Sequence, residues 1–325
     1  MRRGILFLLL ALTDGCAEHQ APMAPPPPVS HDICAALATS GAVPAIQTGR
    51  PDLRVLAFGD FGDGGNDQKS VAQAMVRYDR THPFDLGLVL GDNFYETGIN
   101  DPDSGRWQDQ WEDLYNPLGI RFYATLGNHD YYDPGSPAAE IARSKRSRSW
   151  CLPRRYYTFT AGPVQFFALD TDPIEQKRSP GNQLDWLEKA LAASSAPWKI
   201  VYGHHPVYST GSEHGDTPEM ISDVLPLLKK HKVDVYFAGH DHNLEYLKPE
   251  GDLHFFVSGA GGHHLRVMGT DTGRRAWAVG MTPGFAVLDA DLDSLVVSFF
   301  DAKDKQLCKV TIAKGQPDVA DCPQP

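Results

Sequence analysis

The chain has 325 residues, 42% of them apolar and 22% charged, and its formal net charge is −11. This composition is that of a globular protein, and the length suffices for one large α/β domain or two smaller domains. The negative charge argues against a general nucleic-acid binder, which normally presents a basic face, so we expect no nucleic-acid binding. An acidic chain that handles anionic substrates needs local positive charge, which bound metal ions supply compactly.

Residues 1–16 predict a signal peptide. Arg2 and Arg3 precede an apolar run over residues 5–12, which is too short to span a bilayer and has the length of a secretory core segment. We therefore expect an exported protein, periplasmic or extracellular. Two alternatives stay open at its end: ordinary cleavage nearby, or lipidation of Cys16, which follows a small residue as in bacterial lipoprotein signals and would anchor the protein to a membrane.

A linker and one folded domain follow the signal. Residues 17–50 form a proline-rich linker and lead-in, in which APMAPPPPVS at 21–30 is expected to be extended. The folded domain is predicted over residues 51–315, and residues 316–325 form a C-terminal tail. No later segment is long and apolar enough to predict a membrane span.

Cysteines indicate an oxidising compartment. Apart from Cys16 the chain has an even set, which in an exported protein predicts two disulfides among Cys34, Cys151, Cys308 and Cys322. Three pairings are possible, Cys34–Cys151 with Cys308–Cys322 among them, and the spacing does not decide between them.

Short apolar runs alternate with helical patterns through residues 53–239. Strands are predicted for LRVLAF (53–58), DLGLVL (85–90), RFYATL (121–126), WKIVYG (198–203) and VDVYFAG (233–239). Helices are predicted for residues 67–82, 106–118, 181–194 and 218–231. Such alternation is typical of α/β folds, in which ligands bind beyond the carboxyl ends of the strands. The later runs 254–261 and 285–313 predict hairpin strands of a second, more antiparallel sheet.

Each of the strands predicted in 53–239 ends in a glycine-containing turn that carries side chains suited to metal binding. These side chains are Asp60, then Asp92 with Asn93 and Tyr95, then Asn128 with His129, then His204 with His205, and finally His240 with His242. In any one turn they are readily explained as caps. Five such turns together favour a common site over coincidence.

The residue types suit two metal ions about 3.5–4 Å apart. Asp92 can place one carboxylate oxygen on each ion, Asp60 can hold one ion, and Asn128 adds a neutral oxygen. Residues two apart in an extended segment project to the same side, so His240 and His242 are expected to reach one metal cluster while Asp241 points away.

The motifs GDFGD, GDNFYETG, GNHDYY, GHHPVYS, SEHG and GHDHN occur in this order within residues 52–313. This set resembles the metallophosphoesterases and, within them, the small purple acid phosphatases of the tartrate-resistant type. The resemblance implies that residues 51–315 form a metallophosphoesterase catalytic domain. The fold class implied is α/β (an α+β sandwich), with two mixed β-sheets packed face to face and flanked by helices.

The resemblance also implies the ligands. Ferric iron would be held by Asp60, Asp92, Tyr95 and His242, and a second, divalent ion (iron, zinc or manganese) by Asp92, Asn128, His204 and His240. Tyr95 distinguishes the purple phosphatases from other metallophosphoesterases, and its alternative is an aromatic packing residue in a turn. His129 and His214 would act near the substrate phosphate and leaving group, with Asn128 also contacting the substrate.

The function expected is that of an acid phosphatase, which hydrolyses phosphate monoesters by attack of a metal-bound hydroxide. His129 or His214 would protonate the leaving group. We expect small phosphate esters as substrates and a monomeric protein. One alternative is a manganese- or zinc-dependent phosphodiesterase or nucleotidase of the same superfamily. Another is a non-catalytic surface protein that binds phosphate or metal.

Three further features have open roles. His205 is expected either to pack or to add a proton donor, and it is not a predicted ligand. His263 and His264 follow SGAGG and are expected in a solvated loop, the alternative being that they line the rim of the site. The basic cluster within residues 143–155 is also expected to be a solvated loop, the alternative being attraction of anionic substrates or a membrane surface.

Overall fold

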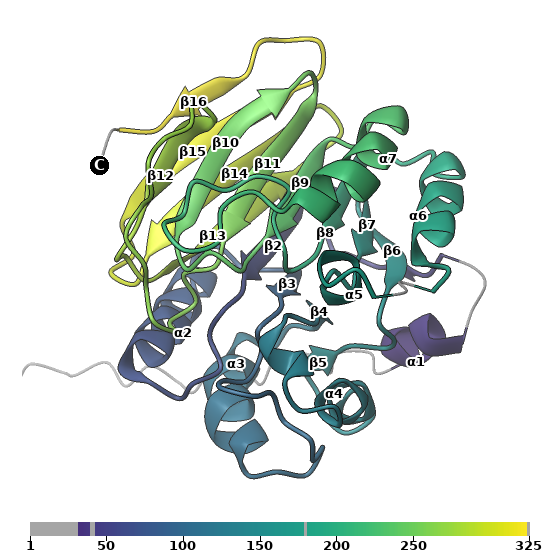
Figure 1. Ribbon diagram of the computed structural model, residues 1–325, viewed down its shortest axis with the longest axis vertical. Coiled ribbons are helices and arrows are strands. Elements are labelled where there is room, and N and C mark those ends of the chain that lie inside the picture. Colours follow the sequence, from purple (N-terminus) through teal and green to yellow (C-terminus); the bar gives the residue numbers. More distant parts are fainter. Residues whose placement is uncertain (1–31, 40–42, 179–180, 324–325) are drawn as a thin grey trace, which may run out of the picture.

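The computed structural model describes residues 32–39, 43–178 and 181–323 (Figure 1). The predicted signal peptide, Cys16 and the polyproline stretch at 21–30 lie outside the described residues. Among the helices that the structure describes, none combines the length and apolar character needed to cross a bilayer.

One eight-stranded sheet begins with the strands predicted nearest the N-terminus. Its parallel half consists of β2 (Leu53–Phe58), β3 (Leu86–Leu90), β4 (Phe122–Thr125) and β5 (Trp150–Cys151). Its antiparallel half adds, outward from β2, β13 (Gly284–Ala290), β14 (Ser294–Asp301), β15 (Gln306–Ala313) and β16 (Val319–Asp321).

A second eight-stranded sheet contains the other predicted strands. In spatial order its strands are β1 (Ala45–Ile46), β6 (Tyr157–Ala161), β7 (Val164–Ala168), β8 (Trp198–Tyr202), β9 (Val235–Ala238), β11 (Leu253–Ser258), β10 (Leu244–Glu250) and β12 (Arg275–Val279). The central strands β7, β8, β9 and β11 are parallel to one another. Both sheets are therefore mixed, as expected.

The C-terminal strands do not form a sheet of their own, contrary to the expectation of a separate, more antiparallel sheet. β11 joins the second sheet beside β9, whereas β13 to β15 join the first sheet beside β2. The apolar patterns identified strands correctly, but they carry no information on which edge each strand extends.

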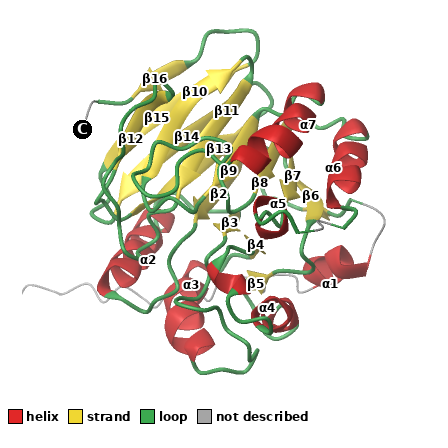
Figure 2. Ribbon diagram, in the orientation of Figure 1, coloured by secondary structure: helices red, strands yellow, loops and turns green. Residues whose placement is uncertain are grey.

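Helices cover the outer faces of the two sheets near their parallel strands (Figure 2). Along the first sheet lie α2 (Asn66–Asp79), η1 (Gln108–Glu112), α3 (Asp113–Tyr115) and η2 (Asn116–Leu118). Along the second lie α5 (Asp172–Glu175), α6 (Gln183–Ala192), η4 (Met220–Val224) and α7 (Leu225–Lys230). The remaining helices are α1 (Asp32–Thr39), η3 (His129–Tyr131) and α4 (Ser136–Arg143).

The main hydrophobic core lies between the sheets and beneath α2 and α3. Strand β2 is buried on both faces, which explains why its sequence is apolar almost throughout. Phe58 packs against Tyr115 and Phe122 on the helical side. A second core cluster fills the space between the second sheet and helices α5 to α7. The sandwich thus matches the fold class expected from the sequence.

Two disulfides link distant segments, as the cysteine count predicted. Cys34 of α1 is bonded to Cys151 of β5, and Cys308 of β15 is bonded to Cys322. The strands β1 and β16 lie outside residues 51–315, the predicted bounds of the folded domain. β1 pairs with β6 of the second sheet, and β16 pairs with β15 of the first. The bounds themselves stay a prediction.

Candidate metal centre

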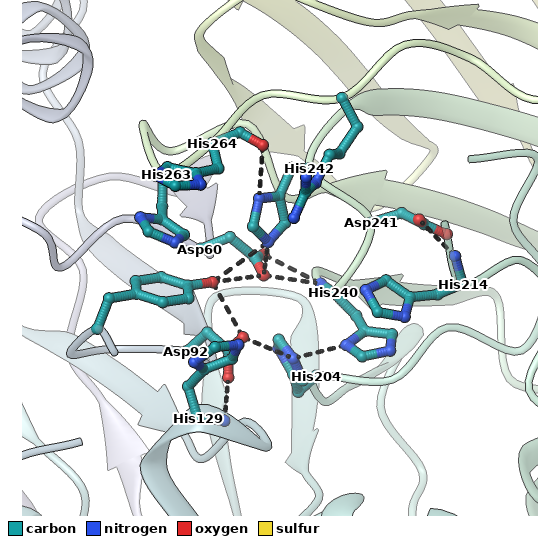
Figure 3. A network of polar contacts seen from close by, with 12 residues as sticks. Asp60, Asp92, His129, His204, His214, His240, Asp241, His242, His263 and His264 are labelled. Atoms are coloured by element: carbon teal, nitrogen blue, oxygen red, sulfur yellow. Dashed lines mark hydrogen bonds and ion pairs between the residues drawn. The ribbon is translucent and has the colours of Figure 1, made fainter. Parts of the chain in front are cut away.

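The five predicted turns meet at one place, because the carboxyl ends of parallel strands from both sheets converge there (Figure 3). The turns after β2, β3 and β4 come from the first sheet, and those after β8 and β9 from the second. The site therefore lies at the junction of the two sheets.

Three of the predicted ligands have left-handed backbone conformations. Asp60, Asp92 and His240 have φ values of 60°, 50° and 71°. Residues with a Cβ atom rarely adopt this region, and such residues cluster at functional sites where the surroundings enforce the strain. The chain reverses sharply at each strand end, and this aims the side chains at the junction.

The glycines in these turns are required by close packing against the ligands. A Cβ atom added at Gly127 would lie 2.2 Å from Asp92 Oδ1, and one added at Gly239 would lie 2.4 Å from Asp60 Oδ2. Both contacts are far shorter than van der Waals distance, so only glycine lets the turns approach the carboxylates.

A first group of side chains surrounds the Tyr95 hydroxyl. This hydroxyl donates to Asp92 Oδ2 at 2.9 Å and lies 3.3 Å from both Asp60 Oδ1 and His242 Nε2. Asp60, Asp92 and His242 are buried, and their ligand atoms lie within 4.8 Å of one another. The carbonyl of His264 accepts from His242 Nδ1 at 3.1 Å, which leaves Nε2 to face the group.

A second group surrounds His204 Nε2. This atom lies 3.4 Å from Asp92 Oδ2, 3.0 Å from Asn128 Oδ1 and 3.1 Å from His240 Nδ1. The opposite nitrogen, His204 Nδ1, lies 2.9 Å from the carbonyl oxygen of Leu90 and donates to it. Asp92 thus belongs to both groups.

Burial opposes charge throughout the site. Burial raises the pKa of the Asp60 carboxyl well above its ordinary value, and lowers the pKa of His242 to about 4. Burial also disfavours ionised Asp92, but the neighbouring His204 outweighs it and holds the pKa of Asp92 below its ordinary range. Conversely, Asp92 and Asp60 overcome burial at His204 and raise its pKa to about 10. The site therefore favours negative charge only where a cation accompanies it.

This donor set fits a dinuclear metal centre. His204 Nε2 faces two oxygens and the ring nitrogen of His240 at once, and a single proton can serve only one of these atoms. A cation would satisfy all four atoms together. Carboxylate, imidazole, phenolate and amide oxygen are ligands that iron, zinc and manganese accept.

All nine predicted site residues lie at the junction. His129 donates its backbone N–H to Asp92 Oδ1 at 2.9 Å, and its Nδ1 donates to the carbonyl of Glu96 at 2.6 Å. The ring of His214 is exposed and packs 3.9 Å from that of His240. Whether each residue acts as predicted, as ligand or proton donor, stays a prediction.

His240 and His242 reach the two adjacent donor groups and Asp241 points away from them, as expected. The expected geometric reason is wrong, because the backbone of His240 is left-handed and not extended. Asp241 is fixed on the far side, where it accepts from Ser209 Oγ and from the backbone N–H of Gly215.

A buried polar network behind Asp92 was not predicted. Asp130 accepts backbone N–H groups of Gly127 at 2.8 Å and Asn93 at 3.0 Å, and Asn93 Nδ2 donates to Glu140 at 2.8 Å. All are buried, and these bonds fix the turns after β3 and β4. The position of Asp130 directly after His129 is a weak sequence indication that it supports the site. Nothing in the sequence around Glu140 on α4 indicates such a role.

For His263 the structure favours the alternative, the rim of the site, over the solvated loop. The residue is only 4% exposed, and its ring stacks on Tyr95 at 3.5 Å between centroids. His264 beside it is exposed, as expected.

His205 is buried and hydrogen-bonded to Thr171 Oγ1 at 2.8 Å, consistent with packing. Most charged side chains of the basic segment 143–155 are exposed, whereas strand β5 within it is buried.

Two adjoining cavities open on the junction. One of about 220 Å³ lies over Asp92, His129, His242 and His263. The other, of about 280 Å³, extends past His205 toward Asp172 and Arg178. Both are lined by Asn128, Tyr132, His214 and His240. A larger cavity of about 820 Å³ opens near Trp198 and Lys314, and none of the predicted site residues lines it.

Comparison with known proteins agrees with this arrangement. Residues 50–244 match the family model of the calcineurin-like phosphoesterases. The chain is 34% identical to tartrate-resistant acid phosphatase type 5 of Sus scrofa, over 81% of this chain and 88% of that protein. It is 32% identical to purple acid phosphatase 7 of Arabidopsis thaliana, over 64% of this chain and 70% of that protein.

Similarity among solved structures extends to a protein that is described as an anchor. The anchor protein of the inner membrane complex of Plasmodium has a TM-score of 0.71 and 22% identity, over 82% of this chain and 90% of that one. At this identity the likeness concerns the fold alone.

Proposed function

Because this chain belongs to the calcineurin-like phosphoesterase family, and within it to the purple, tartrate-resistant acid phosphatases, we propose that it hydrolyses phosphate monoesters with a dinuclear metal centre. The observation that carries this proposal is the pair of donor groups that share Asp92. The proposed ligands of one ion are Asp60, Asp92, Tyr95 and His242. Those of the other are Asp92, Asn128, His204 and His240.

Ferric iron is proposed for the first group and divalent iron, zinc or manganese for the second. Two such ions supply Lewis acidity, which polarises a phosphate ester and makes water acidic at mild pH. The phenol of Tyr95 supports ferric iron. The two buried carboxylates around it disfavour the additional negative charge of a phenolate unless a cation compensates it. Its burial, Asp92 and Asp60 raise the pKa of Tyr95 well above its ordinary value, and a strongly charged cation would reverse this.

His129 and His214 are proposed to handle the substrate and its leaving group, with Asn128. The Glu96 carbonyl accepts a hydrogen bond from His129 Nδ1–H, so Nε2 remains available to exchange a proton. His214 stands where the two cavities join, within reach of a group extending from the phosphate into either one. Proton donation to a leaving alkoxide is typically worth about 10²–10⁴-fold in rate.

The first test is the visible spectrum of the purified, oxidised protein beside a Tyr95→Phe variant. Ferric iron on a tyrosinate gives a broad absorption band, which should vanish in Tyr95→Phe and persist in the control Tyr132→Phe, whose side chain lines the cavity over Asp92 and His129. Hydrolysis of p-nitrophenyl phosphate should exceed that of bis(p-nitrophenyl) phosphate.

Other outcomes would reassign the site. A colourless protein with two metals and faster diester cleavage would indicate a manganese or zinc phosphodiesterase. A protein that binds phosphate without turnover, or that takes up no metal, would overturn the proposed catalysis.

The protein is exported, since its two disulfides require an oxidising compartment. We further propose that the chain is anchored through lipidated Cys16 and acts as a monomer. Membranes of cells that express the full chain should retain the phosphatase, and Cys16→Ser should release it. Release of the unchanged chain to the same extent would contradict the anchor.

A further inference from the structure

Three side chains on one wall of the 220 Å³ cavity lie outside both proposed ligand groups. Glu96, His263 and His264 each offer one ligand atom, and these atoms all lie within 4.8 Å of one another. We call these three residues the rim cluster. Two imidazoles and a carboxylate with this spacing can hold a small cation.

His263 is oriented as metal-binding histidines are. Its Nδ1 lies 3.1 Å from the Asp63 carboxylate, which fixes the tautomer with the proton on Nδ1. Burial opposes ionisation of Asp63, but hydrogen bonds from His263 and the backbone N–H of Gly65 outweigh it and hold the pKa of this carboxyl below its ordinary value, so the carboxylate is ionised. The other ring nitrogen, Nε2, faces Glu96, whose Oε1 lies 3.8 Å away.

The ring of His263 is also held rigidly between two aromatic neighbours. It stacks on Tyr95 at 3.5 Å and on His264 at 4.1 Å between centroids, with interplanar angles of 18° and 14°. A buried, immobilised imidazole loses little side-chain entropy when it binds a ligand. The rim cluster is thus largely preformed.

The backbone of the other two members supports the proposed metal centre, while their side chains are exposed. The carbonyl of Glu96 orients His129, and the carbonyl of His264 orients His242. Their side chains extend instead toward the cavity and solvent, with the Glu96 side chain 68% exposed. A cation can therefore reach the rim cluster without disturbing the buried ligands.

We propose that the rim cluster is an additional, exchangeable binding site for a divalent cation, with zinc as the best match. Two histidines and one glutamate bind zinc while leaving coordination positions open. Those positions face the cavity shared with His129 and His214, where a phosphate oxygen can occupy them. The site adds positive charge at the entrance of an acidic protein's active centre.

The rim cluster does not depend on the proposed function, and metal counting separates the two. The protein with its native metals in place is dialysed to equilibrium against micromolar zinc sulfate, and iron, manganese and zinc per chain are measured. We expect one further zinc ion per chain, lost in His264→Ala and in Glu96→Gln. Both residues are exposed, and unchanged circular dichroism and melting would show that the variants fold.

The matched control is Glu213→Gln. Glu213 lines the same cavity, but its carboxylate pairs with Arg266 at 2.6 Å and does not belong to the rim cluster. This variant should keep the additional zinc, and Asp92→Ala should lose the native metals instead. Absence of additional zinc in the unchanged chain, or its persistence in both rim variants, would overturn the proposal.

Discussion

Asp92 is the residue through which the two donor groups are connected. Its Oδ2 faces Tyr95 and His204, and its Oδ1 is held by the backbone N–H of His129. Its position after Gly91 at a strand end, together with the four similar turns, predicted this aspartate as a candidate ligand. Its left-handed backbone was not predictable, because the neighbouring turns enforce it rather than its own sequence.

Residues that support the ligands were hardest to predict. Asp63 and His263 lie 200 positions apart, and each alone is an ordinary loop residue. Glu140 reaches the network through Asn93 from helix α4, which itself was not predicted. Motifs identify side chains that face a metal, whereas partners behind them depend on tertiary contacts that no local pattern records.

Asp170, just after β7, should make stability depend on pH. Burial, together with Asp172, raises the pKa of Asp170 to about 7 despite the Tyr131 hydroxyl and the cations Arg155 and Arg178. The folded protein therefore keeps a proton that the unfolded chain releases above pH ~4. This contribution is fully present below pH ~4 and is lost as pH rises through about 7. At about 1.4 kcal/mol per pKa unit, it is worth up to ~4 kcal/mol.

The variant Asp170→Asn keeps a neutral hydrogen-bonding side chain and should remove this dependence. Urea unfolding at pH 5 and pH 8 should show a smaller fall in unfolding free energy for Asp170→Asn than for the unchanged chain. Asp185→Asn, at an exposed position on α6, is the charge-matched control. If the free energy of unfolding fell equally between pH 5 and pH 8 in all three proteins, Asp170 would not be the group responsible.

At the scale of elements, the strands that end at the site were predicted almost to the residue. β2 coincides with the run at 53–58, and α2 begins at Asn66, one residue before the predicted start. The two-residue strands β1 and β5 were missed, since such short segments have no measurable period. The hairpin β6–β7 was also missed, although each of its strands is as long as β3. The local sequence pattern could not predict to which of the two sheets each strand belongs.

The disulfide Cys34–Cys151 should stabilise the fold more than the other one does. It joins residues 117 positions apart and holds α1, whose Leu37 is fully buried, against β5. Closing a loop of about 100 residues is worth roughly 4–5 kcal/mol in the chain-entropy model. The double variant Cys34→Ser/Cys151→Ser should lose about this much in denaturant unfolding.

The second disulfide supplies the comparison. Cys308–Cys322 encloses a separation of 14 residues, for which the same model gives about 3 kcal/mol. Cys308→Ser/Cys322→Ser should therefore cost less. If the two double variants lost equal stability, loop closure would not be the dominant contribution.

For the whole molecule, metal removal should weaken the sandwich. The site joins turns of both sheets. Without cations, Asp92 disfavours ionisation of its buried neighbour Asp60, and the surrounding histidines disfavour protonation of His240. Metal ions at free concentrations about 1,000 times their dissociation constants add ~4 kcal/mol to the free energy of unfolding. For a protein of this size we expect chelation, after reduction of the iron, to lower Tm by about 10 °C in calorimetry.

Asp92→Ala is the control for this measurement. It should melt near the temperature of the metal-free protein, and chelation should leave its Tm unchanged. A melting temperature of the unchanged chain that does not respond to metal removal would show that the centre does not hold the sheets together.

The junction of the sheets also divides the donors by chemical type. The first sheet contributes only oxygens, from Asp60, Asp92, Tyr95 and Asn128, and the second contributes only imidazole nitrogens, from His204, His240 and His242. Hard trivalent ions favour the first kind and softer divalent ions the second. We infer that metal preference depends on how the sheets are packed. A core substitution that shifts one sheet against the other should then change the ratio of iron to zinc measured in the purified protein, although every ligand is unchanged.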